Sequence, residues 1–166
     1  MSLIEQTFPI MEKLILNALQ LAEQLHQQLT QETEALKHIQ DAELIDTIAA
    51  NKRQLVAQLE QFSQQLGQVL ATEQLPNHQD GVQAYFQRTE AAGLSSVELT
   101  GNWAKLMSLC AECRALNEQN GASIELLARH TNRSLHILKG KSQTTMTYGP
   151  DGSTRSDNFT RPLISV

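Results

Sequence analysis

The chain has 166 residues, a formal net charge of -5 and only 4% aromatic residues. This length fits one domain, and the acidic charge argues against a nucleic-acid partner, which would need a basic surface. The first residues do not resemble a signal peptide, and no apolar run approaches the roughly 18 residues of a membrane span. We therefore expect a cytoplasmic protein that does not insert into membranes.

Long helices are expected because Gln, Leu, Ala and Glu dominate the chain and lose little conformational freedom in a helix. The first predicted helix covers residues 7–39 and has an apolar face broad enough to meet two other helices. Thr7 or Ser2 can cap its start, and Pro9 fits its first turn. A tight turn over residues 40–42 follows, in which Asp41 is a good N-cap for the next helix.

The second predicted helix has the most regular coiled-coil pattern in the chain. Its seam is a line of residues spaced alternately by three and four: Ile45, Ile48, Lys52, Leu55, Leu59, Phe62, Leu66 and Val69. Lys52 is the polar member of this seam, and we expect its ammonium group to reach water. The periodicity fails over residues 72–94, so we predict a long connection there that can hold a short helix over residues 82–90.

The third long helix is predicted to begin at Ser95, which forms a capping-box pattern with Glu98, and to end at Gly140. Its seam is predicted to contact partner helices along its whole length, about five heptads. The seam residues are Trp103, Leu106, Cys110, Cys113, Asn117, Asn120, Ile124, Leu127, Thr131, Ser134 and Leu138. The pattern is apolar at both ends and polar in the middle.

The dipeptide Asn120-Gly121 has two interpretations. Asn-Gly favours turns and could end the helix there. The three-four spacing passes through it without a phase shift, which favours a continuous helix. In that case Gly121 would let a neighbouring backbone approach closely, and Asn117 and Asn120 would form a polar layer that fixes register or faces a partner.

The two cysteines and five histidines are weak candidates for a metal or redox site. Cys110 and Cys113 lie well inside the predicted helix, whereas a redox pair is normally found at a helix N-terminus. In a continuous helix Cys113 lies roughly 25 Å from His130, too far for a shared zinc ion. We therefore expect both cysteines to fill the core, and we expect no metal, no cofactor and no enzymatic activity.

Residues 141–166 are rich in Ser, Thr, Gly and Asp and have no sustained apolar period. Such a segment cannot bury enough surface to offset its ordering entropy, so we expect a flexible tail that becomes ordered on binding. The predicted fold class is all-α. It is an elongated antiparallel helical bundle, or coiled coil, of three long helices over residues 1–140, followed by this mobile C-terminal tail.

Three segments resemble those of the FlgN-type flagellar export chaperones. The most specific is Trp103 followed by the run from Leu116 to Gly121 (LNEQNG) and an amphipathic stretch ending at Leu138. The second is TYGPDG, residues 147–152, and a weaker third lies between Asp41 and Glu60. The resemblance covers most of the chain in the same order, whereas residues 75–96 match no pattern of that family.

The resemblance implies a cytoplasmic chaperone that binds hook-associated flagellar proteins, also called junction proteins. It would prevent their premature aggregation or assembly and deliver them to the flagellar type III export apparatus. In that family the C-terminal region makes most of the cargo contact, and Tyr148 is also the expected contact with the export gate. The matching cargo-binding residues are Leu127, Leu135, Leu138, Tyr148, Leu163 and Ile164.

From the residues alone, two other functions stay open, and so does the choice between a monomer and a homodimer. The seam from Ile45 to Val69 also suits a structural coiled-coil adaptor or dimerisation module. Such a rod would not need the tail, so deleting the chain from Gly140 onward would leave its partner binding intact. A metal-binding four-helix bundle would instead carry near-stoichiometric zinc or iron.

Overall fold

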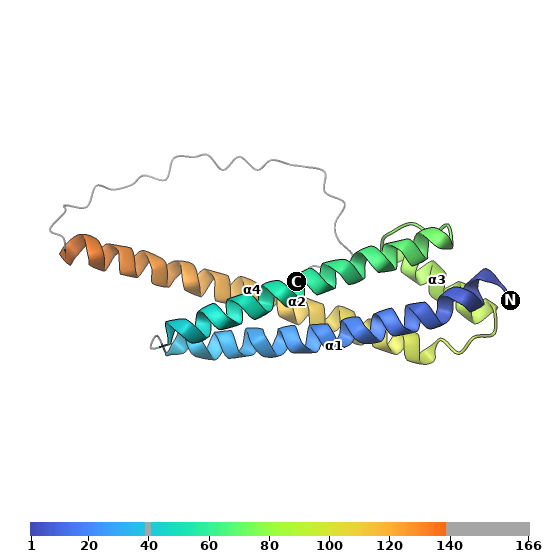
Figure 1. The fold of residues 1–166 in the computed structure, drawn as a ribbon, viewed down its shortest axis with the longest axis horizontal. Coiled ribbons are helices and arrows are strands. Elements are labelled where there is room, and N and C mark those ends of the chain that lie inside the picture. Colours follow the sequence, from blue (N-terminus) through green and yellow to red (C-terminus); the bar gives the residue numbers. More distant parts are fainter. Residues whose placement is uncertain (39–40, 139–166) are drawn as a thin grey trace.

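The computed structural model describes residues 1–38 and 41–138, and these residues form helices without any strand. The four helices are α1 (Leu3–Lys37), α2 (Ala42–Thr72), α3 (Gln79–Ala91) and α4 (Val97–Leu138). The bundle is elongated, with α1 and α2 antiparallel and α4 running in the direction of α1 (Figure 1). The prediction of an all-helical fold is confirmed, and the structure adds α3 as a fourth, short helix. The predicted tail lies outside the described residues.

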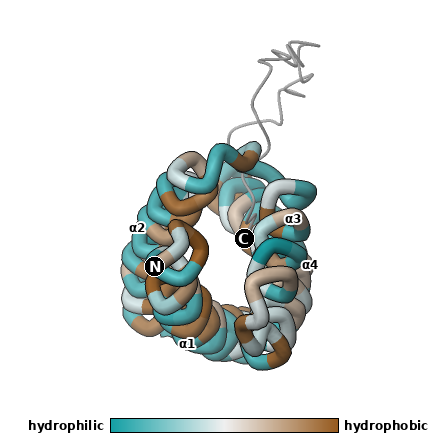
Figure 2. Tube along the Cα trace, turned by 90° about the vertical axis from the view of Figure 1, so that its right-hand side faces the viewer, coloured by the Kyte–Doolittle hydropathy of each residue, from teal (hydrophilic) through white to brown (hydrophobic). Residues whose placement is uncertain are grey.

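The central element of the bundle is α1. It packs along α2 on one side and along α4 on the other, while α2 and α4 have little direct contact (Figure 2). The broad apolar face predicted for the first helix therefore serves two interfaces. Its most deeply buried apolar residues are Met11, Ile15, Ala18, Ala22, Leu25 and Leu29, each at most 2% exposed.

The start of α1 differs from the prediction. The helix begins at Leu3, and the backbone N–H of Ser2 donates to Glu5 Oε2 at 2.6 Å, as in a capping box. Pro9 consequently lies inside the helix and not in its first turn, so it removes the hydrogen bond that its position would give to the carbonyl of Glu5. Of the two predicted caps, Ser2 is therefore the N-cap, and Thr7 lies inside the helix, where its side chain is buried in the bundle.

The connection between α2 and α4 is fixed by buried polar groups. The Thr7 hydroxyl donates to Glu73 Oε1 at 2.7 Å and lies 3.0 Å from the Tyr85 hydroxyl. Burial raises the pKa of Tyr85 to about 12, so this phenol stays neutral. Gly81, at the start of α3, has no room for a side chain, because a Cβ there would lie 1.8 Å from the carbonyl oxygen of Pro76. These contacts hold α3 against the beginning of α1.

The helix α4 is continuous through Asn120-Gly121, which confirms the interpretation that the spacing favoured. It begins at Val97, two residues after the predicted cap, and the Ser96 hydroxyl donates to Glu90 Oε1 at 3.3 Å. Its buried residues are Leu99, Trp103, Leu106, Cys110, Cys113 and Asn120. The prediction that the seam contacts partner helices along its whole length is therefore wrong beyond Asn120. There α4 extends past the end of α1 and the start of α2 (Figure 1).

Both cysteines lie in the core, as predicted. Cys110 and Cys113 are 4% and 0% exposed, and Cys113 Sγ lies 3.7 Å from the backbone oxygen of Ala22 on α1. Burial raises the pKa of Cys110 to about 12 and that of Cys113 to about 11. Neither side chain therefore forms the thiolate that redox chemistry requires at neutral pH.

Candidate functional site: a polar layer and the helix beyond it

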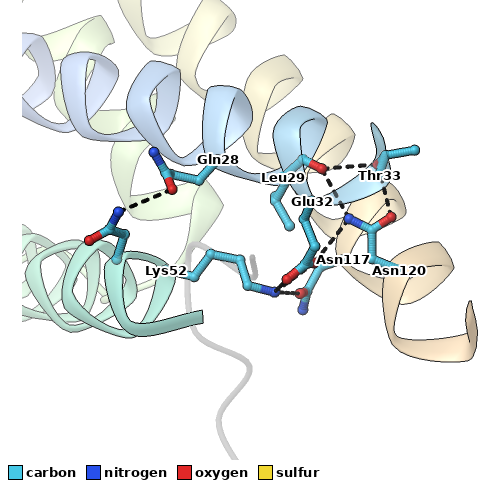
Figure 3. A network of polar contacts seen from close by, with 8 residues as sticks. Gln28, Leu29, Glu32, Thr33, Lys52, Asn117 and Asn120 are labelled. Carbon is cyan, nitrogen blue, oxygen red and sulfur yellow. Dashed lines mark hydrogen bonds and ion pairs between the residues drawn. The ribbon is translucent and has the colours of Figure 1, made fainter. Parts of the chain in front are cut away.

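Polar side chains from the three long helices meet where α4 leaves the bundle (Figure 3). We call this group the polar layer, and its members are Glu32 and Thr33 from α1, Lys52 from α2, and Asn117 and Asn120 from α4. The sequence predicted a polar layer from the two asparagines alone. The structure shows that it is a junction between helices.

Asn120 joins α4 to α1. Its amide nitrogen donates to the backbone oxygen of Leu29 and to Glu32 Oε1, both at 3.0 Å. Its amide oxygen accepts a hydrogen bond from the Thr33 hydroxyl at 2.9 Å (Figure 3). The side chain is 2% exposed, so these bonds replace water and favour one register between the two helices.

An ion pair joins α2 to the same layer. Lys52 Nζ lies 2.9 Å from Glu32 Oε1 and 2.8 Å from Oε2, and it also donates to Asn117 Oδ1 at 3.3 Å (Figure 3). The Glu32 side chain is 1% exposed and the Lys52 side chain is 18% exposed. The expectation that Lys52 reaches water is thus met only in part, because its side chain is 18% exposed while its ammonium group pairs with a buried carboxylate on α1.

Sequence reasoning missed Glu32, although a signal was present. In the first helix Leu25, Leu29 and Leu36 follow the three-four spacing, and Glu32 occupies the seam position between Leu29 and Leu36. An acidic seam residue on one helix and Lys52 on the seam of the next can pair if the two helices are antiparallel neighbours. The sequence analysis singled out Lys52 alone, because a pattern within one helix does not show which seam residue of another helix lies opposite.

Gly121 follows Asn120 but does not have the role predicted for it. A Cβ added at Gly121 would meet no atom of another described segment within 4 Å, so no backbone in the described part of the chain approaches it closely. The prediction of a close approach there is wrong, since α4 is exposed on that side. Glycine at this position therefore leaves the helix locally weaker without any gain in packing.

Replacing Gly121 by alanine is expected to raise the free energy of unfolding by about 0.5–1 kcal/mol, because alanine loses less backbone entropy in a helix interior. Thermal unfolding followed by circular dichroism would show the higher melting temperature. Gly101 is a matched control in the same helix, since a Cβ there also has open space, and Gly101→Ala should give a similar gain. A loss of stability in Gly121→Ala would mean that the helix is not regular at this point.

Beyond the polar layer, α4 continues as a single helix that we call the arm, residues 121–138. At 1.5 Å per residue it extends roughly 27 Å past Asn120. Several of its apolar side chains face solvent, including Ile124 (41% exposed), Leu135 (44%) and Leu138 (82%), while Leu127 is half-buried. Apolar residues spaced by three or four along a helix are normally buried against another helix. On the arm they are largely exposed, which is typical of a surface that binds a partner.

The structure places the predicted cargo-binding residues in two groups. Leu127, Leu135 and Leu138 share one side of the arm, as their spacing of eight and three residues requires. The remaining predicted residues, Tyr148, Leu163 and Ile164, lie outside the described residues. The structure therefore gives the positions of three of the six predicted cargo-binding residues.

A pocket of about 420 Å³ adjoins the polar layer between α1 and α2. Apolar groups of Leu25, Leu29 and Val56 line it together with the charged side chains of Lys52 and Arg53, and Asn117 borders it from α4. In residues 1–38 and 41–138, no group of three or more His, Cys, Asp and Glu residues could hold a metal ion. The same residues include no helix long and apolar enough to cross a membrane.

A model of the protein family described as FlgN protein matches residues 7–156. The chain belongs to the FlgN family. The match includes the polar layer and the whole arm, and it continues beyond the described residues. Comparisons with curated proteins and with solved structures gave no match.

Membership of the FlgN family gives the protein a general role. FlgN proteins are flagellar export chaperones, so this chain acts as a chaperone in flagellar export and its partners are flagellar proteins. The family is one of chaperones.

Proposed function

We propose that this FlgN protein binds hook-associated flagellar proteins in the cytoplasm, prevents their premature aggregation or assembly, and delivers them to the export gate. The observation that carries the proposal is the arm, a regular helix that leaves the bundle with apolar side chains in solvent. An amphipathic segment of a cargo protein can pack on such a helix and bury both apolar faces. The cargo would thereby be kept from aggregating through the same face.

Within this proposal the polar layer supports the arm. Asn120 and the pair of Glu32 and Lys52 hold α4 to α1 and α2 immediately before the arm begins. The arm is already helical although no other described helix covers it, so less conformational entropy is lost on binding than if a disordered segment had to fold. We propose that residues 1–140 act as the bundle domain that presents this binding surface.

Residues 141–166 are proposed to add a second contact, becoming ordered on the cargo. Leu163 and Ile164 would supply apolar anchors, and Tyr148 would contact cargo and then the export gate. Contacts divided between a helix and a short tail can each be weak, so the cargo can be released step by step at the gate. This division makes each part separately testable.

Deleting residues 141–166 is expected to weaken the capture of a hook-associated protein by tenfold or more in a co-purification assay. Leu127→Asp together with Leu135→Asp in the full chain should weaken capture to a similar extent, because these changes place two charges on the apolar side of the arm. Far-UV helicity and melting temperature should change little, since the tail is proposed to be ordered only on cargo and the two leucines do not belong to the buried core.

The matched control is Leu126→Asp together with Ile137→Asp, at positions 56% and 64% exposed on the opposite side of the arm. These changes add the same charge to the same helix and should leave capture within twofold of the original. Full capture by the tail deletion would exclude the tail as a contact, and full capture by the Leu127 and Leu135 variant would exclude the arm.

The alternative function, a structural coiled-coil adaptor, would need the seam of α2 to be exposed for a second chain. Ile48, Leu59 and Leu66, from the seam of α2, are each at most 2% exposed within this single chain. A seam that is already buried against α1 is not available to a second chain. The exposed apolar residues of the arm are the better candidate for intermolecular contact.

A further inference from the structure

The pocket beside the polar layer is lined by all three long helices. The buried side chains of Leu25 and Leu29 line it from α1, and Asn117 lines it from α4. The lining residues of α2 recur every three or four positions, so they lie on one side of that helix: Ala49, Lys52, Arg53, Val56, Ala57 and Glu60. Because α2 and α4 have little direct contact, this side of α2 is left partly open to solvent (Figure 2).

The pocket has dimensions that suit a few turns of a helix. Ala49 and Glu60 are eleven residues apart, so the lined side of α2 is roughly 16 Å long, about three helical turns. On α4 the same side leads onto the arm, because Ile124, Thr131 and Leu138 follow Asn117 at intervals of seven residues. A helix bound in the pocket can therefore continue along the apolar side of the arm.

The charges of the pocket indicate the chemistry of its occupant. Lys52 is already paired with Glu32, whereas Arg53 is exposed and forms no ion pair with another residue in the described part of the chain. Its guanidinium group can bind a carboxylate through two parallel hydrogen bonds. Glu60 lies about 10 Å further along α2 and would repel a partner that is acidic throughout. The pocket thus favours an apolar segment with a single well-placed carboxylate.

We propose that this pocket binds an amphipathic helix of the cargo, whose apolar side chains cover Val56 and whose carboxylate pairs with Arg53. The inference rests on the proposed function, and it adds a site on the bundle to the contact made by the arm. Apolar contact along the arm alone would allow a bound helix to shift by a turn, since successive turns of the arm are similar. An ion pair at the base of the arm fixes the register of the cargo helix.

An exchange of charge with a synthetic peptide tests the ion pair. The probe is a labelled amphipathic peptide with leucines on one face and one glutamate beside them, compared with the same peptide carrying lysine there. Fluorescence anisotropy with the full chain should show at least threefold tighter binding of the glutamate peptide, a modest factor because the ion pair is exposed. Arg53→Glu should reverse this preference. Lys13→Glu, an equal change of charge at an exposed position twelve residues before Leu25, should leave it unchanged.

Filling the pocket tests the same site with cargo. Ala57→Trp places a bulky side chain at an exposed lining position. It should lower the capture of a hook-associated protein at least fivefold while the melting temperature stays the same. Gln58→Trp is the matched control, because Gln58 is also exposed but lines a different hollow between α1 and α2. This control should leave capture within twofold of the original.

Three results would overturn the proposal. Equal affinity of the two peptides would exclude the ion pair, and full capture by Ala57→Trp would exclude the site. A tenfold gain in peptide affinity in the full chain carrying Leu163→Asp and Ile164→Asp would mean that the chain's own C-terminal segment fills the pocket. The proposed function fails separately, if the original chain captures no hook-associated protein, because the peptide preference is measured without any cargo.

Discussion

Replacing Lys52 by methionine is expected to lower the free energy of unfolding by about 3–5 kcal/mol, the usual cost of leaving one member of a buried ion pair without its partner. Glu32 has 1% of its side chain exposed, and Lys52 contacts both of its carboxylate oxygens. Methionine fills a similar volume but provides no charge. The carboxylate would keep only its hydrogen bond from Asn120, and its burial would no longer be compensated.

The partner substitution Glu32→Leu should cost less, because Lys52 is 18% exposed and its flexible chain can turn toward water. The double variant should recover most of the stability lost in Lys52→Met, since an apolar pair often replaces a buried ion pair without loss. Urea denaturation of the four proteins gives the coupling energy directly. A Lys52→Met protein within 1 kcal/mol of the original would contradict the buried ion pair.

Leu59→Ala is the second large effect, with an expected loss of about 2–5 kcal/mol. Leu59 is 2% exposed and belongs to the core between α1 and α2, so its truncation removes buried methyl groups and leaves a cavity. Gln58→Ala, at an exposed neighbouring position of the same helix, should stay within about 0.5 kcal/mol of the original. Equal effects of the two changes in urea melts would show that the seam of α2 is wrongly placed.

Much of the fold could be predicted because helical periodicity reports burial wherever partner helices are present. The seam of α2, the core position of the cysteines and the N-cap at Asp41, which accepts a hydrogen bond from the Leu44 backbone at 3.1 Å, are confirmed. Periodicity could not show where burial stops on α4. The same spacing continues through Leu138, but α1 ends at Lys37, and only the relative placement of helices shows that no other described helix packs on the arm.

The candidate site could be predicted only in part, for a related reason. Asn117 and Asn120 stood out as polar residues in an apolar seam, but their partners are on other helices. Thr33 is 87 positions away from Asn120 and Glu32 is 88 positions away. Such pairings depend on how α1 and α4 are aligned along their axes, which a pattern within one helix does not determine. Gly121 was misjudged because space around a glycine is likewise a property of neighbouring helices.

The central position of α1 determines the order in which the bundle can be completed during synthesis. Contacts between α1 and α2 join consecutive helices and can form as soon as the chain has been made to about Thr72. Contacts between α1 and α4 join residues 91 positions apart, as for Ala22 with Cys113 and for Leu29 with Asn120. One apolar face of α1 therefore stays uncovered on the nascent chain until α4 has been made, so we expect this chaperone to need protection from aggregation during its own synthesis.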